Sequence, residues 1–153
     1  MIPYQCLAPF DWPALLTLIR AEFAFMEGRI DPPSSMHRLT PEAIAAQSRS
    51  GEVWAIGTPP VACVFLTPQP DSLYVGKLAT AASHRRRGLA RQLLELAETR
   101  ARTLGKPFLE LETRVELVEN QTAFTAMGFT ETGRTAHAGH DRPTSITYRR
   151  PVR

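Results

Sequence analysis

The most informative segment of the chain is KLATAASHRRRGLA, residues 77–90. It begins at the end of a strand-like apolar run, passes through three consecutive arginines and opens the strongest helical pattern of the chain at Gly88-Leu89-Ala90. Glycine and alanine let a backbone approach a ligand closely, and the free amides at the start of a helix attract phosphate groups. The segment therefore predicts a phosphate-binding turn between a strand and a helix.

Other interpretations of this basic turn are a solvated surface loop or an RNA-binding patch. A Walker A loop ending at Lys77 is excluded, because Asp71 and Leu78 stand where it needs Gly and Ser or Thr, and no G-x-G-x-x-G occurs in the chain. An RNA-binding sheet would need stacking aromatic residues, and the sequence has no RNP-like motif. Phosphate binding by the backbone is therefore favoured, and no nucleic-acid partner is expected.

Hydrophobic spacing on either side of this segment predicts seven strands and four helices. Asp11 and Thr40, each followed closely by a proline, are the expected N-caps of the first two helices. Residues 28–39 have no period and contain a proline pair, so they are expected to form a long functional loop. The strands are expected at residues 4–8, 53–56, 61–66, 73–80, 108–112, 129–135 and 146–150, and the helices at 12–25, 41–50, 89–104 and 121–127.

The order of these elements, β-α-α-β-β-β-α-β-α-β-β, indicates the fold. The early strands follow one another as antiparallel neighbours, whereas the helix at 89–104 joins strands 73–80 and 108–112 by a right-handed crossover that makes them parallel. We therefore expect an α+β fold, an α/β sandwich whose mixed, mostly antiparallel sheet of about seven strands has helices on both faces. A chain of 153 residues is expected to form a single domain, residues 1–153.

Composition narrows the class of protein. The chain has 18 Lys and Arg against 15 Asp and Glu, a net charge of +3, with 43% apolar residues, which excludes disordered and fibrous proteins. No apolar run reaches the roughly 20 residues of a membrane span, and no signal-peptide pattern is visible, so a cytoplasmic location without a membrane partner is expected. Cys6 and Cys63 are expected to be buried thiols.

The segment resembles the acetyl-CoA motif of the GNAT superfamily of N-acetyltransferases, Gln/Arg-x-x-Gly-x-Gly/Ala, which residues 85–90 match. A second similarity lies downstream, where Asn120 to Phe124 and then Gly128-Phe129 look like the family's Asn-containing helix and its Gly-Phe. The resemblance implies a GNAT-like fold and acetyl-CoA as cosubstrate, and no metal is expected. It also implies a bulge in the strand at 73–80, which would separate it from strand 108–112 and open a cleft for the thioester.

By position, the resemblance implies a set of cofactor contacts. Backbone groups of the strand end would bind the pantetheine arm and the oxyanion, amides of the turn would bind the pyrophosphate, and Asn120 would bind the cofactor arm. Asn120 as a plain helix N-cap is the alternative. Phe124 stands where the family commonly has a tyrosine that protonates the thiolate, so it is expected to form core or channel wall. The implied cofactor-binding residues are Leu78, Ala79, Thr80, Arg85, Arg86, Arg87, Gly88, Leu89, Ala90, Asn120 and Phe124.

Two catalytic residues are expected from the strands. Glu110 and Glu112 share one face of strand 108–112, and Glu112 lies nearer the cleft, which makes it the expected general base. Tyr148, on the last strand, could replace the missing tyrosine acid, with water as its rival. Both also fit purely structural roles, as a surface carboxylate and a half-buried strand aromatic. His137 and His140 fit a hairpin loop better than a metal site.

The expected function is therefore transfer of an acetyl group from acetyl-CoA to a primary amine, by direct attack through a tetrahedral intermediate. A non-catalytic acyl-CoA-binding or regulatory module is the alternative, suggested by Phe124 in place of tyrosine. The acceptor is expected to be a small-molecule or peptide amine bound beside residues 28–39. The chain is expected to act as a monomer or homodimer.

Overall fold

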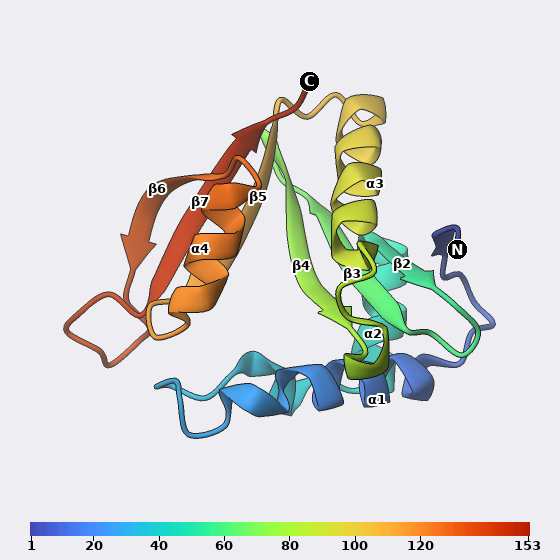
Figure 1. The fold of residues 1–153 in the computed structure, drawn as a ribbon, viewed down its shortest axis with the longest axis horizontal. Helices are drawn as coiled ribbons and strands as arrows, with labels where there is room; N and C mark the ends of the chain where they lie inside the picture. The colour runs from blue at the N-terminus through green and yellow to red at the C-terminus, as the bar shows by residue number, and fades with distance from the viewer.

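The computed structural model describes all 153 residues and contains seven strands and four α-helices (Figure 1). The strands are β1 (Tyr4–Gln5), β2 (Glu52–Ile56), β3 (Ala62–Pro68), β4 (Ser72–Thr80), β5 (Phe108–Arg114), β6 (Thr130–Thr135) and β7 (Ser145–Pro151). The helices are α1 (Trp12–Phe23), α2 (Pro41–Ser50), α3 (Leu89–Thr103) and α4 (Val118–Ala126), with 3-10 turns η1 (Ala24–Met26), η2 (Ser35–Arg38) and η3 (Ala82–His84).

All seven strands form one sheet in the order β1-β2-β3-β4-β5-β7-β6. Only β4 and β5, which α3 connects, are parallel, and every other neighbouring pair is antiparallel. Side chains of α3 pack in one buried cluster and those of α1 and α2 in another. The predicted mixed, mostly antiparallel sheet with helices on both faces is confirmed.

The helix starts follow the predicted local chemistry. The Asp11 side chain accepts a hydrogen bond from the Ala14 amide at 3.2 Å, and the Thr40 hydroxyl accepts one from the Ala43 amide at 3.1 Å. Each bond satisfies an amide that has no partner within its helix. Both predicted N-caps are therefore confirmed.

Several predicted boundaries were wrong. β1 ends at Gln5 rather than residue 8, because the Cys6 amide donates the last hydrogen bond to β2, at the Val53 carbonyl, and the residues after it do not pair with the sheet. α1 ends at Phe23 and continues as the 3-10 turn η1, and η2 interrupts the expected loop at 28–39. α4 begins three residues before the predicted position 121, because VENQTAFTA has no apolar period that marks its first turn.

The sheet divides between β4 and β5. The two strands pair only along Ser72–Tyr74 and Phe108–Glu110, after which β4 follows β3 and β5 follows β7 (Figure 1). Between two β3 residues the register with β4 advances from Ala79 to Gly76, so β4 carries one extra residue there. Lys77, inside this bulge, has a φ of 49°. The bulge that the resemblance implies in this strand is present, and the strand edges beyond it diverge.

The two buried clusters fix the layers around this divergence. Leu93 and Ala97 of α3 pack on one face of the sheet, and Leu15 of α1 with Ile44 of α2 on the other. Cys6 and Cys63 are free thiols buried in the second cluster, as predicted. None of the helices combines the length and hydropathy that a bilayer crossing requires.

Candidate active site

The basic turn has an unusual backbone conformation. After η3, Arg85 is extended, and then Arg86 and Gly88 both adopt positive φ angles, 64° and 75°. Gly88 is the N-cap of α3 and supplies no side-chain hydrogen bond. A Cβ at Gly88 would meet no atom within 4 Å, so the left-handed conformation, and not a lack of space, favours glycine there.

Several backbone amides of this turn have no hydrogen-bond partner. No backbone or side-chain group of the chain accepts a hydrogen bond from the amides of residues 85–91, and the first bond of α3 runs from the Gln92 amide to the Gly88 carbonyl at 2.9 Å. The N-terminus of α3 adds the positive end of its dipole to these donors. A row of free amides beside a helix start is suited to bind phosphate oxygens.

The three arginines are not equivalent. Arg85 forms an ion pair with Glu22 of α1 at 2.7 Å, which ties the turn to the helix beneath it. Arg86 and Arg87 are exposed, and neither forms an ion pair within the chain. Two unpaired cations therefore flank the free amides and favour an anionic ligand at this position.

The adjoining end of β4 has one unpaired edge. Ala79 and Thr80 pair with β3, Leu78 lies in the bulge, and none of the three pairs with β5. Their backbone groups on the β5 side are thus free to bind an extended ligand in a strand-like manner. Leu89 is buried and Ala90 half-buried, so the start of α3 is fixed against the sheet beside this edge.

On the same face of the sheet, α4 carries Asn120 and Phe124 one turn apart. Asn120 donates from Nδ2 to the Thr113 hydroxyl on β5 at 3.3 Å. The N-cap of α4 is Leu117, so the alternative of Asn120 as the N-cap is wrong. The Phe124 ring contacts the rings of Phe129 and Tyr148, with centroids 6.2 and 5.9 Å away.

Glu112 lies on the opposite face of β5. Its side chain is largely exposed and forms no hydrogen bond, whereas Glu110 is held by Arg149 at 2.8 Å. Desolvation of its carboxylate, followed by repulsion from Glu110, raises the pKa of Glu112, and His137 opposes this effect. The structure thus leaves one unpaired carboxylate of raised pKa where the two strands diverge.

Sequence reasoning missed Tyr74, which lies beside Glu112. Tyr74 is opposite Glu110 in the β4–β5 register, and its ring lies 3.4 Å from the position of a Cβ at Gly76, so it runs along β4 towards the bulge. Burial, and then the charges of Glu112 and Glu110, raise the pKa of its hydroxyl. In the sequence, the signal for this residue was a tyrosine two positions before a glycine, Tyr74 and Gly76, within one predicted strand.

The two predicted catalytic residues lie on opposite faces of the sheet. Tyr148 is opposite Leu111 in the β5–β7 register and Glu112 is opposite Thr147, and paired residues of a sheet project to the same side. Tyr148 is only 4% exposed, and burial raises its pKa. Tyr148 therefore belongs to the α4 side, with Phe124, and Glu112 to the α1–α2 side.

Residues 28–39 contact the end of β5. Arg114, the last residue of β5, donates to the carbonyls of Pro32 and Pro33 at 2.6 and 3.1 Å. Arg29 forms an ion pair with Glu119 of α4 at 2.7 Å. The Arg114 contacts hold the segment on the side of the sheet to which Glu112 projects, and the Arg29 contact ties its start to α4.

Comparison with known proteins identifies the family of this chain. The model of the acetyltransferase (GNAT) family matches residues 12–129, a range that includes the free amides and α4. The chain belongs to the GNAT acetyltransferase family. As a GNAT protein it is an acyltransferase, and the expected superfamily is confirmed. No curated protein sequence matches the chain significantly.

Solved GNAT structures share the fold at low sequence identity. A GNAT acetyltransferase from Staphylococcus aureus Mu50 superimposes with a TM-score of 0.76 at 16% identity, covering 99% of this chain and 98% of its own. The ribosomal-protein-S18-alanine N-acetyltransferase of Escherichia coli gives 0.70 at 18% identity, covering 99% and 94%. An Elizabethkingia anophelis GNAT acetyltransferase with acetyl-CoA bound gives 0.68 at 16%, covering 97% and 96%.

Proposed function

We propose that this GNAT protein transfers the acetyl group of acetyl-CoA to a primary amine of a small molecule or peptide. The observation that carries the proposal is the free β4 edge leading directly into the row of unpartnered amides at residues 85–91. An extended arm ending in a pyrophosphate is complementary to that arrangement. The related structure from Elizabethkingia anophelis with acetyl-CoA bound supports the choice of ligand.

The cofactor-binding residues act mainly through their backbone. The amides of residues 85–90 hold the pyrophosphate, with Arg86 and Arg87 adding positive charge. Leu78 and Thr80 bind the pantetheine arm, and an amide at Leu78 or Ala79 stabilises the oxyanion of the tetrahedral intermediate. Asn120 and Phe124 line the α4 side of the arm, where the Asn120 carbonyl oxygen has no partner within the chain.

The reaction needs a neutral amine beside the thioester. Its nitrogen attacks the carbonyl carbon, the C–N bond forms, and collapse of the tetrahedral intermediate breaks the C–S bond. Glu112 takes the proton that the amine loses, directly or through water, because its carboxylate is unpaired and its raised pKa makes it a better base. The products are an acetamide and CoA.

The leaving thiolate then receives a proton. A thiol with a pKa near 8.5 leaves readily as its anion, so a strong acid is not required. Phe124 cannot donate a proton, and Tyr148, which contacts its ring, is the proposed donor. Replacement of Tyr148 by Phe distinguishes this donor from water.

Release of the thiol of acetyl-CoA in the presence of an amine panel tests the function. We expect amine-dependent thiol release together with an acetylated product detected by mass spectrometry. Thermal stabilisation by CoA without thiol release from any amine would instead favour the acyl-CoA-binding module that Phe124 suggests. If CoA does not stabilise the protein and no amine causes thiol release, both functions are contradicted.

A further inference from the structure

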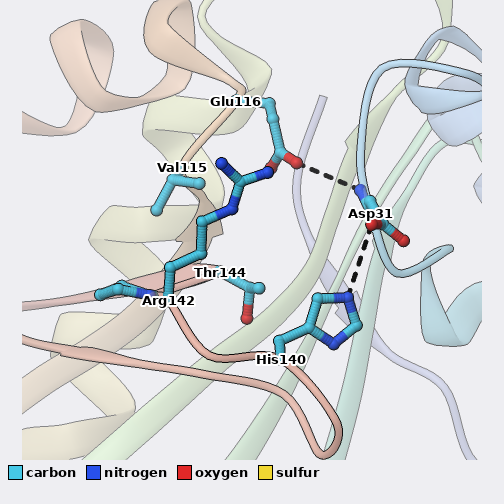
Figure 2. A pocket seen from close by; sticks show the side chains of 7 residues that line it. Asp31, Val115, Glu116, His140, Arg142 and Thr144 are labelled. Atoms are coloured by element: carbon cyan, nitrogen blue, oxygen red, sulfur yellow. Dashed lines mark hydrogen bonds and ion pairs between the residues drawn. The ribbon is translucent and has the colours of Figure 1, made fainter.

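A cavity of about 220 Å³ lies just beyond the end of β5, several times larger than a single water requires (Figure 2). Three segments that are far apart in the sequence line it. Asp31 comes from the segment after α1 and Val115 and Glu116 from the turn after β5. The β6–β7 loop contributes His140, Arg142, Pro143 and Thr144. The cavity is on the side of the sheet to which Glu112 projects, since Arg114 binds the same segment after α1.

Glu116 gives the cavity an unsatisfied acceptor. Its Oε2 accepts a hydrogen bond from the Asp31 amide at 3.1 Å, whereas its Oε1 is buried and has no donor. Only one other buried side-chain polar atom in the chain lacks a partner, Nε of Arg150. The torsion that orients a glutamate carboxylate is broad, so rotation of the group to offer Oε1 to a ligand would replace the hydrogen bond of Oε2 with the Asp31 amide. The Asp31 carboxylate, 3.5 Å from His140, adds a second negative charge.

Arg142 gives the same cavity an unsatisfied cation. Its side chain is exposed and extends into the space between the β6–β7 loop and Glu116, yet no ion pair joins the two residues (Figure 2). The Glu116 carboxylate and the Arg142 guanidinium line one cavity without forming an ion pair, so a ligand that carries both a positive and a negative charge is complementary to them. An ammonium fits the Glu116 and Asp31 side, and a carboxylate fits Arg142.

We propose that this cavity binds the head group of a free α-amino acid whose side chain ends in the amine that is acetylated. The proposal rests on the proposed function, because it identifies the acceptor of the same reaction. β5 rises about 3.3 Å per residue, so its last residue, Arg114, lies about 7 Å beyond Glu112, and the cavity lining begins at the next residue, Val115. That separation suits a diamino acid such as lysine or ornithine.

The arrangement also selects which amine reacts. Carboxylates around the α-ammonium favour its protonated form, which has no lone pair for attack. The side-chain amine reaches Glu112, loses its proton there and attacks the thioester, which breaks the C–S bond and releases CoA. The expected product from lysine is therefore Nε-acetyl-lysine, with the head group unchanged.

Four acceptors of matched length separate the two charges of the head group. Lysine carries both charges, ε-aminocaproate lacks the α-ammonium, cadaverine lacks the carboxylate and pentylamine lacks both. We expect kcat/KM for lysine to exceed that for ε-aminocaproate by about 10- to 100-fold, the effect of a charge-assisted hydrogen bond. The advantage over cadaverine is expected to be about 2- to 5-fold, because Arg142 is exposed.

Variants assign each preference to a residue. Glu116→Gln should reduce the lysine to ε-aminocaproate ratio to near one, and Arg142→Gln should remove the advantage of lysine over cadaverine. Glu95→Gln is the matched control, since it removes the same charge at an exposed position of α3 that forms no ion pair and lies outside the cavity. It should preserve both ratios.

A second readout does not depend on turnover. With CoA in place of acetyl-CoA, lysine should raise the melting temperature of the wild type more than pentylamine does, and Glu116→Gln should abolish the difference.

The proposal is overturned if the four acceptors react within twofold of one another, or if ε-aminocaproate reacts as efficiently as lysine. It is also overturned if Nα-acetyl-lysine amide, which has no charged head group, matches lysine. If pentylamine is acetylated in these experiments, the proposed acetyltransferase function still holds. If no amine causes thiol release, both the function and the choice of acceptor are contradicted.

Discussion

The two sides of the β4–β5 divergence are built in different ways. The proposed cofactor side consists mostly of backbone groups from one contiguous segment, residues 77–90. The proposed acceptor side consists of side chains from separate elements, with Tyr74 on β4, Glu112 on β5 and Glu116 after it. Backbone binding depends on local conformation, which a short motif can encode, whereas side-chain binding depends on the register that brings distant segments together. Substitutions should therefore affect the two sides by different mechanisms.

The largest expected effect is on the acceptor side. Glu112→Gln keeps the size of the side chain but removes its basicity, so kcat should fall by about 10²- to 10⁴-fold while CoA affinity is unchanged. The raised pKa of Glu112 implies that kcat of the wild type declines with falling pH, starting above the range of an ordinary glutamate, near 4.3. This limb of the pH profile should be absent in the variant.

Initial rates of thiol release at several pH values check this prediction. Glu95→Gln, at an exposed position of α3, controls for the change in net charge. A Glu112→Gln variant with the wild-type rate and pH profile would make Glu112 a structural residue.

The next effect is on the cofactor side, at Gly88. Gly88→Val must hold a β-branched residue at a φ of 75°, which costs about 1–2 kcal/mol and displaces the free amides. Loss of one charge-assisted hydrogen bond to the pyrophosphate should weaken CoA binding by about 10- to 100-fold. Calorimetric titration with CoA measures this change.

Gly105 offers a matched control. It has a φ of 70°, a Cβ placed on it would meet no atom within 4 Å, and it follows the far end of α3. Gly105→Val should lose as much stability as Gly88→Val but keep wild-type CoA affinity. Equal affinities in both variants would show that the turn does not bind the cofactor.

The cofactor side should also stabilise the fold without any acceptor. CoA at about 100 times its dissociation constant adds about 2.7 kcal/mol, which for a chain of this size raises the melting temperature by about 5–11 °C. Glu112→Gln should show the same shift, because the carboxylate lies on the other side. Differential scanning fluorimetry checks this, and a wild type that does not respond to millimolar CoA contradicts the cofactor assignment.

The smallest effect is expected on the α4 side of the cofactor arm, at Phe124. Phe124→Tyr should change kcat by less than about tenfold, or about 1.4 kcal/mol, since a thiolate leaves without a strong acid. Tyr148→Phe should lower kcat at constant CoA affinity if Tyr148 donates the proton. An inactive wild type that becomes active as Phe124→Tyr would contradict the proposed mechanism.

The sequence was sufficient for the elements whose signals are local. Asp11 and Thr40 mark helix starts through their own side chains, and residues 77–90 contain the strand end, the turn and the helix start in one segment. The parallel pairing of β4 and β5 followed from the helix between them. These features need no information about distant residues.

The remainder depends on register and three-dimensional proximity. The face of β7 that carries Tyr148 is fixed only by its pairing with Leu111, and a shift of one residue would place Tyr148 beside Glu112. The cavity at Glu116 needs three segments to meet, and none of them has a recognisable motif. The start of α4 was missed because its first turn has no buried residue to mark it.

The bulge in β4 also changes which face of the sheet the side chains after it project to. Val75, before it, contributes to the core beneath α3, whereas Ala79, four residues later, contributes to the core beneath α1 and α2. An uninterrupted strand would send both side chains to the same face. Deletion of one residue between them would therefore keep both side chains on their present faces, because three steps along a regular strand also end on the opposite face. It would instead remove the bulge, so the divergence of β4 from β5 depends on this one extra residue.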